Sequence, residues 1–326
     1  MDVRLVTPEG TQHCLPDQLP ELLTRDDGFV WVDLPVGDQD TERVLSKVFC
    51  FHPRAVRDCL ERNALPKVHV YREHVLVVLH APEAGERGHV HYLELDQFIG
   101  RRYLVTVHGP VNPAVDPAAA LAETDQVAAR LDSGRLRPAS PDALSASIVS
   151  ALTSRMRDHL DARTTDVWHF EQQVTAGQLG DAEQFLDGMF RIRHGLLVVR
   201  TMASLSHEVY GRMHALDVYG DEGRRLLENS LDQFQRLAAM ARSQEAYLQG
   251  VIEFYQTRTN TKMTIAAERL AVIASITLPI TALSSVMGMN IIVNSATDPV
   301  FLVALIVVMT AMSAVLLLWT KRRGWW

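Results

Sequence analysis

Two uncharged hydrophobic runs mark the C-terminal part of the chain. Residues 270–287 carry no charged side chain, and neither do residues 299–320. Each run is close to the roughly 20 apolar residues that a membrane-spanning helix needs. The segment between them is short, and Asp298 is its one charged residue. The pattern therefore predicts a helical hairpin that crosses a membrane twice, and it disfavours the alternative, a buried hairpin in a soluble protein.

Basic residues flank both hydrophobic runs. Three precede the first run and three follow the second: Arg258, Lys262, Arg269, Lys321, Arg322 and Arg323. Because basic flanks stay on the cytoplasmic side of a membrane, both ends of the chain are expected in the cytoplasm and the connecting loop outside. The sequence thus predicts a multi-pass protein of the cell (inner or plasma) membrane, with lipid around the hairpin at residues 269–326.

The preceding part, residues 136–268, has a helical character. Ser140 followed by Pro141 is a typical helix start. Helices are expected over residues 140–175 and again up to about residue 216. A third helix is expected from residue 224, and no proline interrupts it before residue 279. This third helix is expected to continue into the first membrane span, so residues 136–268 are predicted to form a cytoplasmic helical region with a stalk.

Residues 1–135 alternate strand and helix signals. Strands are expected where β-branched and aromatic residues gather: residues 3–6, 29–34, 67–80, 91–99 and 103–108. Helices are expected over residues 40–49 and 53–61. The fold class predicted for the whole chain is an α/β cytoplasmic domain with a mixed sheet, a long helical stalk and a two-helix C-terminal membrane hairpin.

Composition excludes several classes of function. The formal net charge of −7 offers no basic face for nucleic acid. The cysteines, Cys14, Cys50 and Cys59, are odd in number and lack paired spacing, so they are expected to stay reduced in the cytoplasm. The chain has no phosphate-binding loop motif and no catalytic constellation. It is therefore expected to be neither a nucleotide-driven pump nor an enzyme, and to need no organic cofactor.

Histidines are the remaining candidates for a metal site in the N-terminal part. His89 and His91 would share one face of a strand, and His69 and His74 lie nearby in the sequence. A zinc site needs three or four ligands with close supporting contacts. No cysteine pair, HExxH motif or suitably spaced carboxylate accompanies these histidines. The favoured interpretation is that they are surface residues or are satisfied by hydrogen bonds.

A resemblance becomes visible at the end of the first hydrophobic run. The sequence Pro279-Ile280-Thr281 is followed by Gly288-Met289-Asn290. This resembles the CorA family of magnesium and divalent-cation channels, whose signature is Gly-Met-Asn at the outer end of the first of two C-terminal spans. The N-terminal part is also similar, in His52-Pro53, Pro66-Lys67-Val68 and Tyr71. The resemblance implies a homopentamer in which the first spans surround a pore.

The third helix carries a stripe of small and polar residues that leads to the Gly-Met-Asn motif. In an isolated helix such a stripe would be ordinary packing, whereas a ring of first spans would use it to line a path. The candidate pore-lining residues are Glu253, Asn260, Thr264, Leu270, Leu278, Thr281 and Ser285, with Gly288, Met289 and Asn290 as the selectivity motif. Leu270 and Leu278 are candidates for an apolar constriction that gates by dewetting.

The candidate ion ligands carry oxygen. Magnesium sheds its water reluctantly, so a ring of Asn290 amides is expected to recognise the ion through its water shell. The acidic segment that follows the motif in the family is missing here, because Asp298 is its single carboxylate. The resemblance also implies a cytoplasmic sensing site made of carboxylates between subunits. Our candidates for that site are Glu228, Asp232 and Glu253.

The predicted function is passive transport of divalent cations, chiefly magnesium with cobalt or nickel, through a homopentameric channel that cytoplasmic magnesium closes. Magnesium would then be both the transported and the regulatory ion. Two alternatives stay open. One is a zinc transporter of the same superfamily, which the motif does not separate from a magnesium channel. The other is a membrane-anchored sensor or scaffold.

Overall fold

The computed structural model of the chain describes residues 1–35, 39–177, 182–216, 219–291 and 299–322. Side chains are described for the same residues except 182, 287–291, 299 and 301–302. The chain forms two compact units, Met1–Val251 and Ile252–Trp326. The boundary falls inside one long helix, α7 (Asp221–Ile291). The division that the sequence suggests at residues 135 and 268 stays a prediction.

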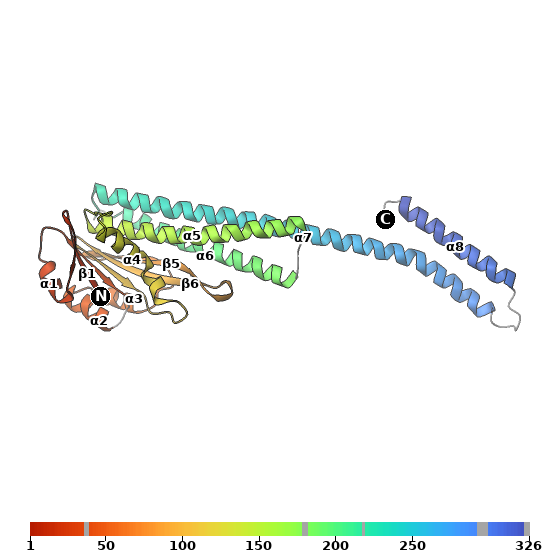
Figure 1. The fold of residues 1–326 in the computed structure, drawn as a ribbon, viewed down its shortest axis with the longest axis horizontal. Helices are drawn as coiled ribbons and strands as arrows, with labels where there is room; N and C mark the ends of the chain where they lie inside the picture. The colour runs from red at the N-terminus through yellow and green to blue at the C-terminus, as the bar shows by residue number, and fades with distance from the viewer. Residues whose placement is uncertain (36–38, 178–181, 217–218, 292–298, 323–326) are drawn as a thin grey trace. The chain divides into compact units, whose positions relative to one another are not determined.

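A mixed seven-stranded sheet forms the centre of the N-terminal part (Figure 1). Its strand order is β2-β1-β3-β7-β6-β5-β4. The strands are β1 (Asp2–Thr7), β2 (Gly10–Cys14), β3 (Phe29–Leu34), β4 (Lys67–Val70), β5 (His74–Ala84), β6 (Val90–Gly100) and β7 (Tyr103–His108). The central pair β3 and β7 is parallel and the other pairs are antiparallel. The predicted mixed sheet is therefore confirmed.

One expected strand was wrong in its extent. Residues 67–80 were predicted to form a single strand, but they divide into β4 and the first part of β5. A tight turn separates the two, in which the Tyr71 N–H donates to the His74 carbonyl at 2.9 Å. The chain reverses there because the polar pair Arg72-Glu73 sits between two apolar segments that pair with each other. The β4–β5 hairpin closes one edge of the sheet.

Short helices cover one face of the sheet. They are α1 (Leu19–Leu22), α2 (Gln39–Arg43), the π-helical turn η2 (Val44–Val48) and α3 (Pro53–Leu60), with the 3₁₀ turns η1 (Pro16–Gln18) and η3 (Glu86–Gly88) in the connections. Val32, Phe98 and Cys59 belong to the buried cluster between this face and α3. His52 begins α3, because its Nδ1 accepts the Arg54 N–H at 3.1 Å and Pro53 occupies the first turn.

Longer helices cover the opposite face. They are α4 (Pro117–Asp132), α5 (Pro141–Ala176) and α6 (Ala182–His214), and α5 and α6 run side by side (Figure 1). The Ser145 hydroxyl of α5 donates to Gln97 Oε1 of β6 at 2.5 Å, which fixes α5 on the sheet. The first part of α7 packs on α5 through Thr153, whose hydroxyl donates to Gln233 Oε1 at 2.6 Å.

The predicted helix ends match the local chemistry. At the start of α5 the Ala143 N–H donates to Ser140 Oγ at 3.2 Å, with Pro141 in the first turn. At its end Gly177 adopts φ of 77°, a left-handed conformation that favours glycine and stops the helix. The expected start of the next helix, the one predicted to run up to about residue 216, lies outside the described residues. The helix that follows, α6, ends near the predicted position.

The second unit contains the rest of α7 and one further helix, α8 (Pro299–Arg322). α7 continues through Pro279. A proline inside a helix removes one backbone hydrogen bond, here the one that Ser275 would accept. Membrane helices tolerate this loss when hydroxyl groups and neighbouring helices satisfy the backbone. The two helices together form the predicted C-terminal hairpin.

Candidate functional site

The hydrophobic parts of α7 and α8 differ from the core helices of a soluble protein. Each contains a long apolar stretch, and only 6% of that stretch is buried within the chain. A soluble core helix would bury most of such a surface. These two helices therefore expose their apolar side chains as membrane spans do, which disfavours the soluble alternative.

One face of α7 is shielded within the second unit. Val272 is buried, and Ile276, Ile280 and Leu283 on the same face are half-buried. Their spacing of four, four and three residues is that of one helical face. The covered residues of α8 follow the same spacing: Leu305, Met309, Met312, Leu316 and Thr320. Because the two helices form one compact unit, these faces are where they pack on each other.

The predicted pore-lining residues lie on the other side of α7. At about 100° of rotation per residue, Thr281 is about 180° around the helix from Val272. The remaining members of the stripe fall between about 160° and 280° from Val272, whereas Val272, Ile276, Ile280 and Leu283 span about 0° to 80°. In the stripe's sector the small residue Ala274, at about 200°, is half-buried. The predicted pore-lining residues are all exposed in the single chain: Glu253, Asn260, Thr264, Leu270, Leu278, Thr281 and Ser285. Leu270 and Leu278 are each 67% exposed, so α8 does not cover them.

The threonine hydroxyls on this stripe are satisfied in a way that suits a cation path. Thr264 Oγ1 donates to the Asn260 carbonyl at 3.0 Å, and Thr281 Oγ1 donates to the Thr277 carbonyl at 2.8 Å. Each hydroxyl proton is therefore used inside the helix. The hydroxyl oxygens keep lone pairs that can accept hydrogen bonds from water. Hydrated cations turn water hydrogens outward, so acceptors are the groups that such a path requires.

Two parts of the predicted site stay untested by the geometry. Gly288, Met289 and Asn290 belong to the last turn of α7, but their side chains lie outside the described residues. Glu228 and Asp232 are exposed one turn apart on α7 in the first unit, and Glu228 Oε1 lies 3.1 Å from His214 Nε2. Glu253 belongs to the second unit.

The candidate histidines have individual partners. His91 Nδ1 lies 3.1 Å from Asn112 Nδ2, and the ring centroids of His89 and His91 are 4.6 Å apart. His69 lies 3.6 Å from Asp58. Burial lowers the pKa of His74 to about 4, where its ring stacks on Tyr71. Within the described ranges no group of three or more His, Cys, Asp or Glu side chains is arranged to hold a metal ion.

An acidic pair that the sequence pattern does not reveal lies buried under α3. Asp96 of β6 is 0% exposed and Glu94 is 7% exposed. Both Asp96 carboxyl oxygens are buried without a hydrogen-bond partner in the described part of the chain, and the Cys59 thiol lies near them. Burial raises the pKa of Asp96 well above its usual range, and repulsion from Glu94 raises it further. The alternation of residues 93–99 looks like a strand with a solvent-facing polar side, so only the tertiary structure shows the burial.

Comparison with known proteins decides the family. The family model described as "CorA-like Mg2+ transporter protein" matches residues 26–322. The chain belongs to this family. Its members are transporters or channels and not enzymes, so the predicted resemblance, the membrane location and the absence of catalytic function are confirmed. Transport of divalent metal ions is the activity of the family.

Individual relatives agree with this assignment. The chain is 24% identical over 330 residues to the putative metal ion transporter YfjQ of Bacillus subtilis (strain 168), covering 98% of each chain. The complete structure of the CorA magnesium transporter from Methanocaldococcus jannaschii superposes with a TM-score of 0.82 at 15% identity, covering 100% of this chain and 99% of that one. The structure of the ZntB cytoplasmic domain from Vibrio parahaemolyticus RIMD 2210633 superposes with a TM-score of 0.62 at 10% identity, covering 80% of this chain and 98% of that one. These structures confirm the predicted fold class.

Proposed function

We propose that this chain is one subunit of a homopentameric channel for divalent cations, chiefly Mg²⁺, in the cell membrane. Five copies of α7 would surround the path, with α8 on the outside. The observation that carries the proposal is the position of the small and polar stripe on the face of α7 that α8 leaves uncovered. A helix that served only as an anchor has no need for hydroxyl and amide groups on its exposed side.

The stripe suits an ion that keeps its water shell. Stripping water from Mg²⁺ is costly and would demand an octahedral protein cage. Outward-facing hydroxyl oxygens at Thr264 and Thr281 can instead accept hydrogen bonds from that water. Asn290 amide oxygens would do the same at the outer mouth. The membrane potential supplies the driving force, about 4.6 kcal/mol per 100 mV for a divalent ion.

Gating follows from the apolar and acidic groups along α7. Leu270 and Leu278 project from the exposed stripe and would close the path by dewetting when the subunits draw together. Mg²⁺ bound between Glu228, Asp232 or Glu253 of neighbouring subunits would offset the repulsion between those carboxylates, and carboxylate oxygens are its preferred ligands. High cytoplasmic Mg²⁺ would therefore hold the channel closed. The cytoplasmic position of both ends follows from the basic flanks.

Ion uptake into liposomes separates this proposal from its rivals. The full-length protein would be reconstituted with a trapped metal indicator, and Mg²⁺, Co²⁺, Ni²⁺ and Zn²⁺ would be supplied under a potassium diffusion potential. The proposal predicts potential-driven Mg²⁺ uptake without a pH gradient. Uptake of Zn²⁺ alone, or uptake that requires a proton gradient, would favour the zinc transporter. Failure of every ion to enter would favour a membrane-anchored sensor or scaffold.

A pair of threonine variants tests the role of the stripe. Thr281→Val removes the hydroxyl acceptor from α7 while keeping the shape, so it is expected to slow Mg²⁺ uptake several-fold. Thr310→Val is the matched control, because Thr310 is exposed on α8 and also donates to its own helix, at 2.8 Å to the Ile306 carbonyl. Equal loss in both variants would contradict a path along α7.

A further inference from the structure

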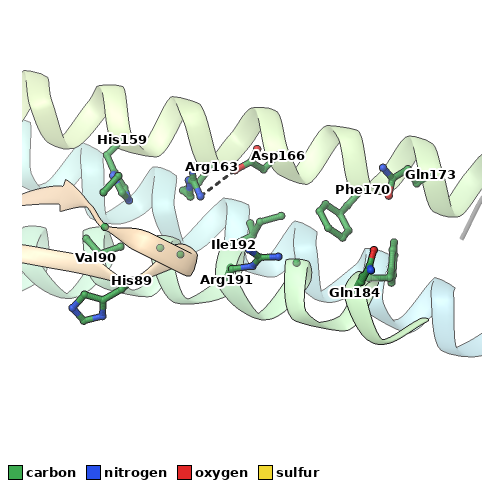
Figure 2. A pocket seen from close by; sticks show the side chains of 16 residues that line it. His89, Val90, His159, Arg163, Asp166, Phe170, Gln173, Gln184, Arg191 and Ile192 are labelled. Carbon is green, nitrogen blue, oxygen red and sulfur yellow. Dashed lines mark ion pairs between the residues drawn. The ribbon is translucent and has the colours of Figure 1, made fainter. Parts of the chain in front are cut away.

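The N-terminal unit contains a cavity that the transport function does not use. It has a volume of about 690 Å³ and lies between α5, α6 and the tip of the β5–β6 hairpin (Figure 2). Cavities of about 300–1,000 Å³ are the size that holds small-molecule ligands. Its lining residues recur at helical spacing along both helices, and they include Arg163 and Phe170 on α5 and Arg191 on α6.

Three glycines leave space for side chains that line this cavity. A Cβ at Gly195 would lie 2.8 Å from Arg163 Cδ, and one at Gly188 would lie 2.3 Å from Phe170 Cζ. Gly88, with φ of 80°, would place a Cβ 2.4 Å from Arg191 Cγ. Larger residues at these three positions would displace the arginines and the phenylalanine. The backbone is therefore shaped to hold Arg163, Phe170 and Arg191 in their present places, and such preorganisation favours binding.

The cavity is electropositive. Among its lining residues two arginines, Arg163 and Arg191, face one carboxylate, Asp166. Arg163 Nη1 is 3.2 Å from Asp166 Oδ2, but its Nε is buried without a hydrogen-bond partner in the described part of the chain. The buried His159 Nε2 also lacks one there. Both of these atoms have no accessible surface and therefore do not border the open space, so the guanidinium groups of Arg163 and Arg191 are the positive charges that the cavity offers.

The two ends of the cavity differ in chemistry. Arg163 and Arg191 offer planar guanidinium groups, which suit the paired oxygens of a phosphate. Seven residues further along α5, about 10 Å at 1.5 Å per residue, Phe170 lies 5.0 Å from Phe185 between ring centroids. The amides of Gln173 and Gln184 line the same end. This end offers an apolar aromatic surface with hydrogen-bonding groups beside it, as a nucleobase requires.

We propose that this cavity is a binding site for a nucleoside phosphate, with the phosphate between Arg163 and Arg191 and the base beside Phe170. The ligand would join α5, α6 and the β5–β6 hairpin in the cytoplasmic part of each subunit. The site does not depend on the ion path, so it stands even if the transported ion proves different.

Equilibrium dialysis with the full-length protein in detergent tests the site. ATP, ADP, adenosine and inorganic phosphate would be compared with Mg²⁺ present and with Mg²⁺ chelated, so that binding of the metal complex is told apart from binding of the nucleotide. ATP or ADP is expected to bind under at least one of these conditions, and adenosine and phosphate far more weakly. Phosphate binding as tight as ATP would overturn the assignment of a nucleoside site.

Substitutions locate the bound nucleotide. Arg191→Gln is exposed and should fold normally, and it is expected to weaken ATP or ADP binding about tenfold or more, as loss of a charge-assisted hydrogen bond does. Arg163→Gln should act similarly. Phe170→Leu should weaken nucleotide binding without changing the affinity for phosphate. Arg193→Gln is the matched control, because Arg193 is exposed on α6 and does not line the cavity. Undiminished binding in both cavity arginine variants would refute the site.

Discussion

The buried carboxyl of Asp96 makes the stability of the N-terminal unit depend on pH. Asp96 is fully buried, with Glu94 on its own strand, Cys59 and Asp58 on α3 and Lys67 on β4 as the titratable groups around it. Burial and then repulsion from Glu94 raise the pKa of Asp96 well above its usual range, and the Cys59 thiol and Lys67 lower it only in part. The carboxyl therefore favours its neutral form in the folded protein.

The sign of the effect follows from proton binding. The folded protein binds the proton more tightly than the unfolded chain, where the pKa of an aspartate is about 3.9. The contribution of the neutral Asp96 carboxyl to the unfolding free energy is therefore fully present below that value. It is lost as pH rises through the raised pKa of the folded state. A difference of one proton corresponds to about 1.4 kcal/mol of unfolding free energy per pH unit.

Asp96→Asn removes this dependence, because the amide has a similar shape and carries no charge. At acidic pH the variant is expected to be equal to the parent or less stable by about 1–3 kcal/mol, since the added amide donors are buried. As pH rises, the unfolding free energy of the variant should increase relative to that of the parent by up to about 1.4 kcal/mol per pH unit. Part of the pH dependence should persist, because burial also raises the pKa of Glu94.

Labelling of the buried Cys59 measures this effect in the full-length protein. The protein in detergent would be treated with a maleimide over a urea series at pH 5 to 8. Mass spectrometry of the Cys59 peptide would then give the unfolding free energy, with a denatured chain as the chemical reference. Asp125→Asn, at an exposed position on α4, is the matched control and should follow the parent. Parallel pH profiles for the Asp96→Asn variant and the parent would refute the reasoning.

Three further predictions concern transport and assembly. Asn290→Ala should abolish Mg²⁺ uptake in liposomes while the oligomer remains intact by size-exclusion chromatography, and normal uptake would remove Asn290 from the selectivity motif. Native mass spectrometry of the purified protein should show five copies, and a transporting monomer would remove the ring. Combined Glu228→Gln, Asp232→Asn and Glu253→Gln should lessen the protection that millimolar Mg²⁺ gives the cytoplasmic part against protease; undiminished protection would place the sensing carboxylates elsewhere.

Local signals were sufficient for much of the fold. Ser140 and Pro141 marked the start of α5, and its end lies close to the expected residue 175, because caps and left-handed turns depend on neighbouring residues alone. The start of α4 carries the same kind of signal. Asp116 Oδ1 accepts the Ala118 N–H at 2.9 Å and Pro117 fills the first turn, so this helix could have been predicted but was missed.

Other features depend on contacts between distant segments. β2 is a polar edge strand, Gly10–Cys14, without apolar alternation, and its pairing with β1 defines it. The burial of Asp96 arises because α3 covers the face of β6 that carries this carboxyl. The cavity between α5 and α6 likewise depends on a distant contact, because glycines of α6 pack against Arg163 and Phe170 of α5. The stripe on α7 was predictable, because its periodicity lies within one helix.

The central claim is that ions pass along the face of α7 that α8 leaves uncovered. Substituted-cysteine accessibility tests this claim most directly. Single cysteines would replace each residue from 264 to 285 in a parent whose native cysteines are removed, and Mg²⁺ uptake would be measured before and after treatment with a water-soluble thiol reagent. Block is predicted at Thr264, Leu278, Thr281 and Ser285, and not at Val272, Ile276 or Ile280, which face α8. Block that follows the α8-covered face, or that shows no helical period, would contradict an ion path along α7.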